Sequence, residues 1–210
     1  TEESKPSTQA SPLLFDLTSL QREANGKFGF SAKTTLSIAQ SLYERHKALT
    51  YPRTDSRALP EDYLPTVKQT FEMLAGSHQS HLAPHAKKAL AEGYVRPSKR
   101  IFDNTKVSDH FAIIPTLQEP GVLSDAERKL YDLVVRRFMA VFFPSAEHLV
   151  TTRITTVLTA PTLPASRGSL PPEGDGPGLG RPGAGASHDG KSYNFQSNGK
   201  VLVKPGWLAI

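Results

Sequence analysis

The sequence contains no cysteine, one tryptophan and two methionines among its 210 residues. The absence of cysteine excludes disulfides, thiol nucleophiles, iron–sulfur clusters and every zinc site that needs sulfur, so no zinc is expected. No apolar run approaches the roughly 20 residues that span a bilayer, and the polar start lacks the features of a signal peptide. The sequence therefore favours a soluble, non-secreted protein with no membrane partner, whose chemistry comes from oxygen and nitrogen groups.

The excess of positive charge is small, because 25 Lys and Arg residues face 20 Asp and Glu residues, for a net charge of +5. Apolar residues make up 38%, which is too much for a wholly disordered chain with this little net charge. Most of the net charge is local, since residues 85–106 hold six Lys and Arg against two acidic residues. Such a window is either a solvated face or, beside a reactive group, a strip that recruits phosphates.

Glycine and proline are concentrated in residues 161–190, which hold 8 of the 15 glycines and 6 of the 17 prolines. This composition has no hydrophobic period and predicts a disordered linker or insertion. It lacks the Gly-Lys-Ser/Thr and GxGxxG patterns of phosphate-binding loops, and no ATP site is visible. Residues 1–12 are polar and predict a tail, with structure starting near Leu13. The final apolar run, PGWLAI, predicts a chain that continues beyond it.

Five segments have the apolar spacing of helices. They are a short helix capped by Thr18, residues 31–46 opened by Ser31, residues 64–75, residues 81–93, and a long helix through Val141 that a capping box of Ser124 and Glu127 opens. After Pro144 the period changes to that of a strand over residues 148–160. Residues 192–196 and 200–203 flank Asn198-Gly199, a pattern typical of a hairpin. The fold class predicted is α+β.

The segment LTYPRTDSR, residues 49–57, combines a hydroxyl nucleophile with a cation. A tyrosine phenol with a pKa near 10 is only about 0.1% ionised at pH 7, so it needs a neighbouring cation to act as a nucleophile. In extended backbone the side chains of Tyr51 and Arg53 point to the same side, and arginine is suited to grip a phosphate with two nitrogens. The pair suits attack on a phosphodiester, although the same residues also fit a surface turn in which Arg53 pairs with Asp55.

A second candidate is His110, in the block SDHFAIIPT. It is the only one of the seven histidines that lies between an acidic residue and an apolar run. Such a histidine can donate a proton or a hydrogen bond to a transition-state oxygen. Asp109 need not be its partner, because adjacent side chains often diverge. Considered alone, His110 also fits a histidine at the mouth of a buried strand.

Four blocks in order, FGFSAKTTLSIAQSLYE, LTYPRTDSR, SDHFAIIPT and GKVLVKPGWLAI, resemble the central part of type IA DNA topoisomerases, most of all the bacterial topoisomerase III branch. The resemblance covers the chain except residues 1–12 and 161–190. It implies that Tyr51 is the tyrosine that cleaves one DNA strand and becomes joined to the 5′ phosphate. It implies that Arg53 holds the scissile phosphate and that His110 is the active-site histidine of a His-x-Ala-Ile block, with Phe111 where this branch often has a second histidine.

The resemblance also places Ser31, Lys33 and Gln40 in a stretch that lies against the DNA backbone. Further candidates for DNA binding are Thr54, next to the tyrosine motif, and Lys99 and Arg100, in the basic window. A helix start can bind phosphate through its exposed amides, which supports Ser31 and Lys33 independently of the resemblance. The expected partner is single-stranded DNA in the bacterial nucleoid of the cytoplasm.

The resemblance implies an ATP-independent reaction, because exchanging one phosphodiester for another conserves bond energy. Complete enzymes of the family hold Mg²⁺ in an upstream toprim domain, and this chain has no Asp-x-Asp-x-Glu run. Asp55, Glu61 and Asp62 are the nearest acidic residues to the tyrosine, and we interpret them as solvent and turn residues with no metal role. Mg²⁺ is therefore expected for the complete enzyme, with its ligands outside this chain, and the isolated chain is expected not to relax supercoiled DNA.

The resemblance also predicts a fragment of several domains. Residues 13–48 would end a helical DNA-binding domain, residues 49–148 would form a mainly helical tyrosine-bearing domain, and residues 149–160 and 191–210 would be antiparallel strands of the linking arch. The insertion at 161–190 would then be a loop of the arch.

Three other hypotheses remain open from the sequence. A catalytically silent single-stranded DNA-binding module would explain the basic window and the absent toprim domain. A tyrosine recombinase also uses Tyr, Arg and His on DNA, but with two separated arginines and a tyrosine late in its domain. The third is a structural α/β domain.

Overall fold

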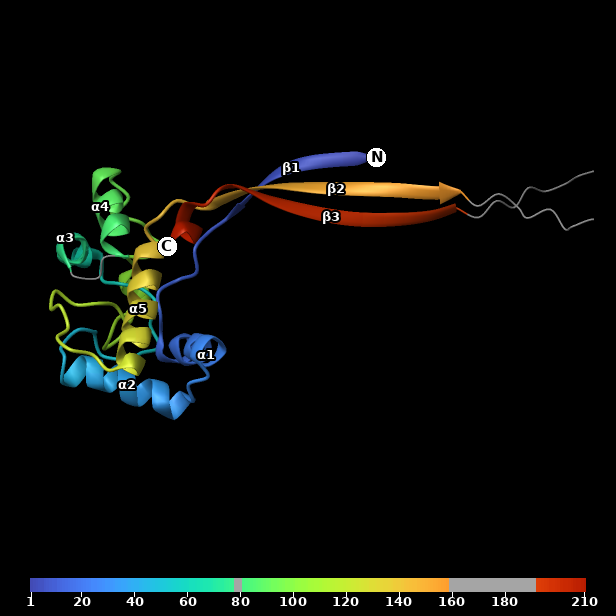
Figure 1. Cartoon of the computed structure of the whole chain (residues 1–210). Helices are drawn as coiled ribbons and strands as arrows, with labels where there is room; N and C mark the ends of the chain where they lie inside the picture. The colour runs from blue at the N-terminus through green and yellow to red at the C-terminus, as the bar shows by residue number, and fades with distance from the viewer. Residues whose placement is uncertain (78–80, 159–191) are drawn as a thin grey trace, which may run out of the picture. The chain divides into compact units, whose positions relative to one another are not determined.

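The computed structural model describes residues 1–77, 81–158 and 192–210 (Figure 1). The predicted insertion at 161–190 lies outside these residues. The chain divides into two compact units, one of Thr1–Lys5 with Leu149–Val201 and the other of Pro6–His148 with Leu202–Ile210. Among the residues described, no helix is long and apolar enough to cross a membrane.

The larger unit contains all five predicted helices. They are α1 (Leu17–Phe28), α2 (Ala32–Glu44), α3 (Leu64–Gly76), α4 (Ala83–Ala91) and α5 (Asp125–Ala140), with short 3₁₀ turns at Glu61–Tyr63, Asn104–Lys106 and Gly206–Ala209. Ser31 caps α2, and Ser124 and Glu127 form the capping box of α5, so both predicted starts are confirmed.

The start of α1 differs from the prediction. The cap is Asp16 rather than Thr18, and its Oδ1 accepts a hydrogen bond of 2.6 Å from the backbone N–H of Ser19. The helix ends at Gly29, whose φ of 72° is the left-handed conformation that glycine adopts without strain. An aspartate accepts a backbone hydrogen bond as well as threonine does, so the helix starts at the earlier residue.

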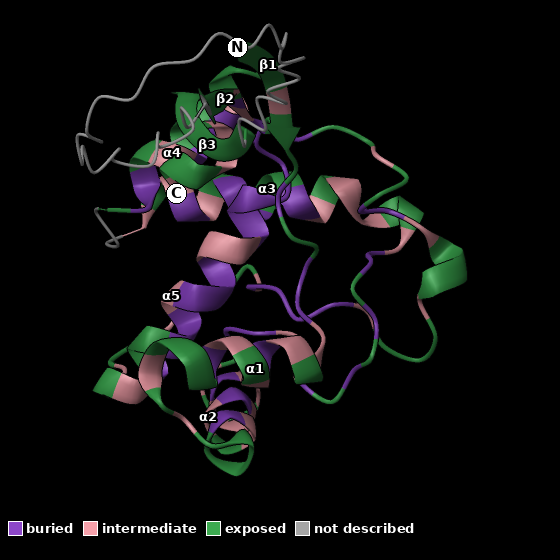
Figure 2. Cartoon of the chain, turned by 90° about the vertical axis from the view of Figure 1, so that its right-hand side faces the viewer, coloured by how far each residue is buried: buried purple, intermediate pink, exposed green. Residues whose placement is uncertain are grey.

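Helix α5 is the centre of the core (Figure 2). Its buried residues include Leu130, Leu133, Val134, Val135, Phe138 and Met139. Phe71 of α3 packs against Phe138 and Phe142 with ring centroids 5.1 and 5.5 Å apart. Helix α2 is joined to α5 through the contact of Ser41 with Glu127. Residues 13–48 and 49–148, predicted to belong to two domains of a larger enzyme, therefore share one core in this chain.

Strands β1 (Glu2–Gln9), β2 (Ala146–Leu158) and β3 (Ser192–Lys204) form one sheet in that order. Thr1 and Ile154 exchange two backbone hydrogen bonds of 2.8 Å, and the side chain of Ser4 contacts that of Thr151. The residue numbers in β2 therefore decrease as those in β1 increase. Thr152 is hydrogen-bonded to Asn198 and Thr156 to Asn194, so β2 and β3 also run in opposite directions. The sheet is antiparallel, which confirms the α+β class.

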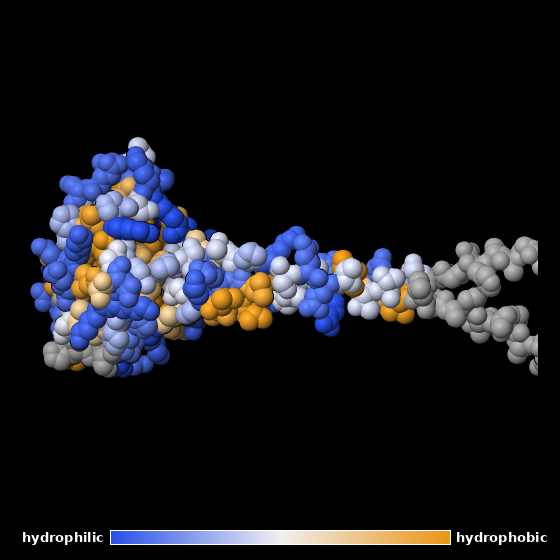
Figure 3. Space-filling view, turned by 90° about the horizontal axis from the view of Figure 1, so that it is seen from above, coloured by the Kyte–Doolittle hydropathy of each residue, from blue (hydrophilic) through white to orange (hydrophobic). Residues whose placement is uncertain are grey.

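Two predictions about these strands were wrong. Residues 2–9 of the expected polar tail form β1, because backbone pairing with β2 stabilises an extended chain whose side chains need not be buried. The expected hairpin at Asn198-Gly199 is absent from the described residues, since β3 runs unbroken through it and pairs with β2. Apolar side chains on the sheet, such as Phe195 and Val201, are about 60% exposed. Figure 3 shows separate apolar patches among polar residues on the surface of the strands.

We expect Phe138→Ala to lower the free energy of unfolding by about 3–5 kcal/mol, because it leaves a cavity between α3 and α5. Urea denaturation followed by circular dichroism measures the change. Leu117→Ala is the control, since Leu117 is 48% exposed and its truncation should change the value by less than about 0.5 kcal/mol. Equal losses in the two variants would contradict the assignment of α5 as the core.

Candidate functional site

The predicted nucleophile lies in a short loop whose two ends are held by one extended segment, residues 112–114. At the first end, the N–H of Thr50 donates to the carbonyl of Ile114 and the N–H of Ile114 donates to Thr50 Oγ1, both at 3.0 Å. At the other end, the N–H of Ala112 donates to the carbonyl of Ala58 at 3.0 Å. Residues 51–57 therefore leave this segment and return to it, and His110 lies just before it.

Tyr51 and His110, which are 59 positions apart, are brought together by this arrangement. Their ring centroids are 4.3 Å apart with an angle of 39° between the rings. Tyr43, in the last turn of α2, contacts the ring of Tyr51 edge-on, and the centroids of these two rings are 5.4 Å apart. Tyr51 is half-buried and His110 is exposed, so a phenol and an imidazole share one open surface. Sequence reasoning missed Tyr43, although it lies one helical turn after the predicted Gln40.

The backbone at Arg53 is not extended, contrary to the prediction from the sequence. The chain bends at Pro52 and Arg53, which breaks the rule that residues two apart point to the same side. The Arg53 side chain is exposed, and in the part of the chain that the structure describes it makes no hydrogen bond or ion pair, with Tyr51 or with Asp55. Likewise, among the described residues no carboxylate is hydrogen-bonded to the ring of His110, so Asp109 is not its partner here.

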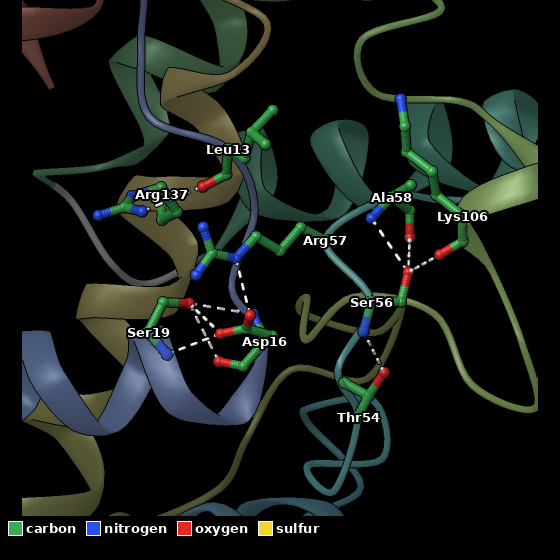
Figure 4. Close-up of polar contacts among 9 residues, drawn as sticks. All are labelled: Leu13, Asp16, Ser19, Thr54, Ser56, Arg57, Ala58, Lys106 and Arg137. Atoms are coloured by element: carbon green, nitrogen blue, oxygen red, sulfur yellow. Dashed lines mark hydrogen bonds and ion pairs between the residues drawn. The ribbon is translucent and has the colours of Figure 1, made fainter.

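The residues after Arg53 are fixed by hydrogen bonds inside the protein (Figure 4). Thr54 is 7% exposed, and its Oγ1 donates to the carbonyl of His110 at 3.3 Å and accepts from the N–H of Ser56 at 3.1 Å. Ser56 Oγ donates to the carbonyl of Lys106 at 2.7 Å. The prediction that Thr54 contacts DNA does not fit a buried hydroxyl that is already engaged. Thr54 instead ties the tyrosine loop to His110.

Arg57 connects the same segment to the start of α1 (Figure 4). Its Nε donates to Asp16 Oδ2 at 2.8 Å, while Oδ1 of the same carboxylate caps the helix. Burial raises the pKa of Asp16, but hydrogen bonds from Arg57 and Ser19 outweigh it, so the pKa is below its ordinary value. The carboxylate is ionised at neutral pH and holds the arginine. The sequence signal for this contact was an aspartate directly before a helical pattern, which is typical of a cap.

A buried carboxylate anchors the end of α2 from which Tyr43 contacts Tyr51. Glu127, 5% exposed, accepts from Ser41 Oγ at 2.7 Å and from Arg45 Nη2 at 2.5 Å. Its other oxygen accepts from Ser124 Oγ at 2.7 Å and from the N–H of that residue at 2.9 Å. One side chain therefore closes the capping box of α5 and fixes the last turn of α2.

The remaining predicted DNA contacts are spread over the unit. Ser31 and Lys33 lie exposed at the start of α2, and Gln40 is half-buried near its end. Helix α2 is about 20 Å long at 1.5 Å per residue, so the first two are far from the Tyr43 contact. Lys99 is exposed, with its Nζ 3.9 Å from Glu61 Oε1. Arg100 donates through Nη1 to Ser11 Oγ at 3.1 Å and through Nη2 to the carbonyl of the same serine.

Within the described ranges, no three Asp, Glu or His residues gather into a group that could hold a metal ion. Asp55 and Glu61 are exposed, and the carboxylate of Glu61 faces Lys99. Mg²⁺ therefore has no set of ligands among these residues, and no chemical step is assigned to it here.

The pH dependence of stability tests the Glu127 anchor. Burial raises the pKa of Glu127, but hydrogen bonds from Ser124 and Ser41 and the charge of Arg45 outweigh it and lower the pKa to about 2. Its stabilisation is then complete above the ordinary pKa near 4.5 and is lost as the pH falls through about 2. We expect the free energy of unfolding to fall by up to about 3 kcal/mol over this window, and to fall less in Glu127→Gln.

Urea titrations at successive pH values measure this difference. Glu72→Gln, at an exposed position of α3, is the matched control and should keep the pH dependence of the parent chain. A parent chain and a Glu127→Gln variant with the same slope below pH 4.5 would rule out the anchor.

Known proteins resemble this chain in sequence and in fold. The family model described as DNA topoisomerase matches residues 1–210. The DNA topoisomerase 3 of Bacillus licheniformis is 52% identical over 140 residues, which are 65% of this chain and 19% of that protein. The DNA topoisomerase 3 of Bacillus subtilis is 51% identical over 140 residues, again 65% of this chain and 19% of that protein. The chain thus spans about a fifth of the length of these relatives.

The solved structure of full-length topoisomerase I from Thermotoga maritima has the same fold over 99% of this chain and 28% of that one, with a TM-score of 0.56 and 20% identity. The family match covers the whole sequence, including all four blocks that carry the resemblance. The chain belongs to the type IA DNA topoisomerase family and is similar to its topoisomerase III branch.

Proposed function

We propose that this chain carries the strand-cleaving half of a type IA DNA topoisomerase active site, with Tyr51 as the nucleophile. The observation that carries the proposal is the contact of the Tyr51 and His110 rings, with centroids 4.3 Å apart on an open surface. The names of the Bacillus relatives, DNA topoisomerase 3, support DNA as the substrate. The breaking and rejoining of one strand, with passage of another, would be performed by the longer protein.

The reaction is an exchange of phosphodiesters. Tyr51 Oη attacks the phosphorus and loses its proton, the bond from phosphorus to the 3′ oxygen breaks, and that oxygen takes up a proton. The product is a 5′-phosphotyrosine and a free 3′ hydroxyl. Since one phosphodiester replaces another, the step is reversible and needs no ATP. Rejoining is the same reaction with the 3′ hydroxyl as the nucleophile.

The neighbouring side chains suit this reaction. The exposed guanidinium of Arg53 has no partner among the described residues, so it is free to bind two phosphate oxygens and to stabilise the charge that develops on them. The imidazole of His110 can give a proton or a hydrogen bond to the departing 3′ oxygen. Thr54 positions this histidine through its backbone carbonyl.

Single-stranded DNA is the proposed partner, and α2 offers a path for it. Lys33 and Gln40 are two helical turns apart and share a face with Tyr43, which contacts Tyr51. A strand lying along this face would place phosphates near the lysine and the helix start at Ser31 while its scissile phosphate lies at Tyr51. Lys99 stays a further candidate contact on the exposed surface.

The rest of the enzyme is proposed from the family resemblance. A toprim domain of the same protein would supply Mg²⁺, so the chain alone would bind DNA without relaxing it. Residues 13–48 and 49–148 would belong to the DNA-binding and tyrosine-bearing domains, and residues 149–160 and 191–210 to the arch. The protein would act in the bacterial cytoplasm, on the nucleoid.

Trapping the covalent adduct tests the nucleophile. Single-stranded oligonucleotides labelled at either end are incubated with the longer protein that carries this sequence and a toprim domain, with Mg²⁺, and are stopped with denaturant. We expect the 3′ label to migrate with the protein and the 5′ label to be released, because the tyrosine retains the 5′ phosphate. Tyr51→Phe should abolish the adduct, while Tyr94→Phe, which removes the hydroxyl of a tyrosine whose ring packs against Phe143, should leave it unchanged.

The other possible outcomes would overturn the proposal or support one of the alternative functions. An adduct that survives in Tyr51→Phe overturns the proposal. A 5′ label on the protein identifies a 3′-phosphotyrosine and revives the tyrosine recombinase hypothesis. Binding of the oligonucleotide with no adduct in the presence of Mg²⁺ identifies a silent single-stranded DNA-binding module.

The role of His110 has its own test. We expect His110→Gln to slow adduct formation by roughly 10²- to 10⁴-fold with little change in oligonucleotide affinity, because the lost group acts on the leaving oxygen. Rapid quenching of single-turnover reactions measures the rate. His81→Gln on the surface beside α4 is the control, and its rate should match that of the parent. Equal rates for the two variants would remove His110 from the mechanism.

A further inference from the structure

A cavity with three cations lies beside the tyrosine segment. Its volume is about 430 Å³, and it is lined by Leu13, Arg57, Ala58, Arg100 and Lys106. Four of these residues are seen together in Figure 4. The lining includes no carboxylate. Two apolar side chains and three positively charged ones thus form its wall.

Each cation is held in place by a contact that leaves part of it available. Arg57 uses only Nε on Asp16, and in the part of the chain described here its Nη1 and Nη2 have no partner. Its side chain is 41% exposed. Arg100 is fixed through the hydroxyl and the carbonyl of Ser11, which are neutral and leave its charge in place. Preorganised arginines lose little conformational freedom when they bind a ligand.

Lys106 is the third cation of the cavity wall, and a hydrogen bond fixes its backbone. Its carbonyl accepts from Ser56 Oγ at 2.7 Å, which ties it to the tyrosine segment. Its Nζ is 2.8 Å from Asp103 Oδ2, and its side chain is 61% exposed, so two of its three N–H groups are available to a ligand. Three positive charges are therefore opposed by two carboxylates, and neither carboxylate lines the cavity.

The chemistry of this wall selects a phosphate. Arginine nitrogens in a fork match two phosphate oxygens, and apolar walls strengthen the attraction by lowering the local dielectric. Arg57 follows Arg53 by four residues, a separation of at most about 13 Å in extended backbone. A second phosphate of the same strand is therefore within reach when the first lies at Arg53.

We propose that this cavity binds a phosphate group of single-stranded DNA, next to the phosphate that is cleaved, with Arg57, Arg100 and Lys106 as its ligands. Only the choice of DNA as the source of the phosphate rests on the proposed function. Free inorganic phosphate and a mononucleotide offer the same group. The experiment therefore compares the three.

Binding of a fluorescent dT₁₂ oligonucleotide to the 210-residue chain is measured by anisotropy from 50 to 300 mM salt. We expect Arg57→Gln and Lys106→Gln each to weaken binding by about 3- to 10-fold and to reduce the slope of log Kd against log salt by about 0.7, the loss of one phosphate contact to a single strand. Arg57→Lys should keep most of the slope. The controls Arg128→Gln on α5 and Lys87→Gln on α4 remove exposed cations outside the cavity and should change neither value.

Thermal unfolding of each variant separates binding from folding, since Arg57 also holds Asp16, whereas within the described residues the Lys106 ammonium is paired with Asp103 alone. Competition by inorganic phosphate or dTMP that is stronger in the parent than in Lys106→Gln, with unchanged dT₁₂ affinity, assigns the site to a free phosphate and overturns the DNA proposal. Parent-like affinity and slope in folded Arg57→Gln and Lys106→Gln also overturn it. The adduct assay of Tyr51→Phe is independent, so either proposal can fail alone.

Discussion

The site depends on the pairing of residues 112–114 with both ends of the tyrosine loop. Thr50 pairs with Ile114 on one side and Ala58 with Ala112 on the other, so a single extended segment decides where the loop leaves the core and where it returns. His110 directly precedes that segment, and its contact with Tyr51 follows from the same pairing. Because Tyr51 and His110 are 59 positions apart in the sequence, these hydrogen bonds are needed to bring the two rings into contact. The reactive pair is therefore a product of tertiary structure, set on a half-exposed edge of a well-packed core.

Two carboxylates, one buried and one half-buried, hold the residues at that edge in place against the core. Glu127 joins α5 to the last turn of α2, and Tyr43 on that turn contacts Tyr51. Asp16 caps α1 and holds Arg57. In each case a carboxylate satisfies a helix end and an arginine at once, which makes removal of one partner costly, because it leaves a desolvated group without a hydrogen bond. Arg53, by contrast, makes no hydrogen bond or ion pair with the described residues, as suits a side chain whose proposed partner is a substrate phosphate.

The sequence predicted the helices well because each has a clear period and a recognisable cap, as at Ser31 and Ser124. It failed where backbone pairing decides the structure. Strand β1 has no hydrophobic pattern, and β3 passes through Asn198-Gly199 because β2 pairs with it along its length. In the site, residue types identified Tyr51 and His110 as candidates, but the extended backbone assumed between Tyr51 and Arg53 is replaced by a bend at Pro52 and Arg53. Thr54 was assigned to DNA because a motif does not reveal burial, and Arg57 was overlooked because its role depends on Asp16, Arg100 and Lys106 from distant parts of the chain.

The central claim is that one particular oxygen, Tyr51 Oη, forms the bond to DNA. Mass spectrometry of the trapped adduct after digestion with nuclease and trypsin tests it most directly. Trypsin cleaves after Lys47 and Arg53, and the peptide between these sites, ALTYPR, contains Tyr51 as its only tyrosine. The account predicts a nucleotide attached to this peptide, with fragment ions that place it on Tyr51. A nucleotide on another peptide, or on Thr50 within this one, would contradict the account.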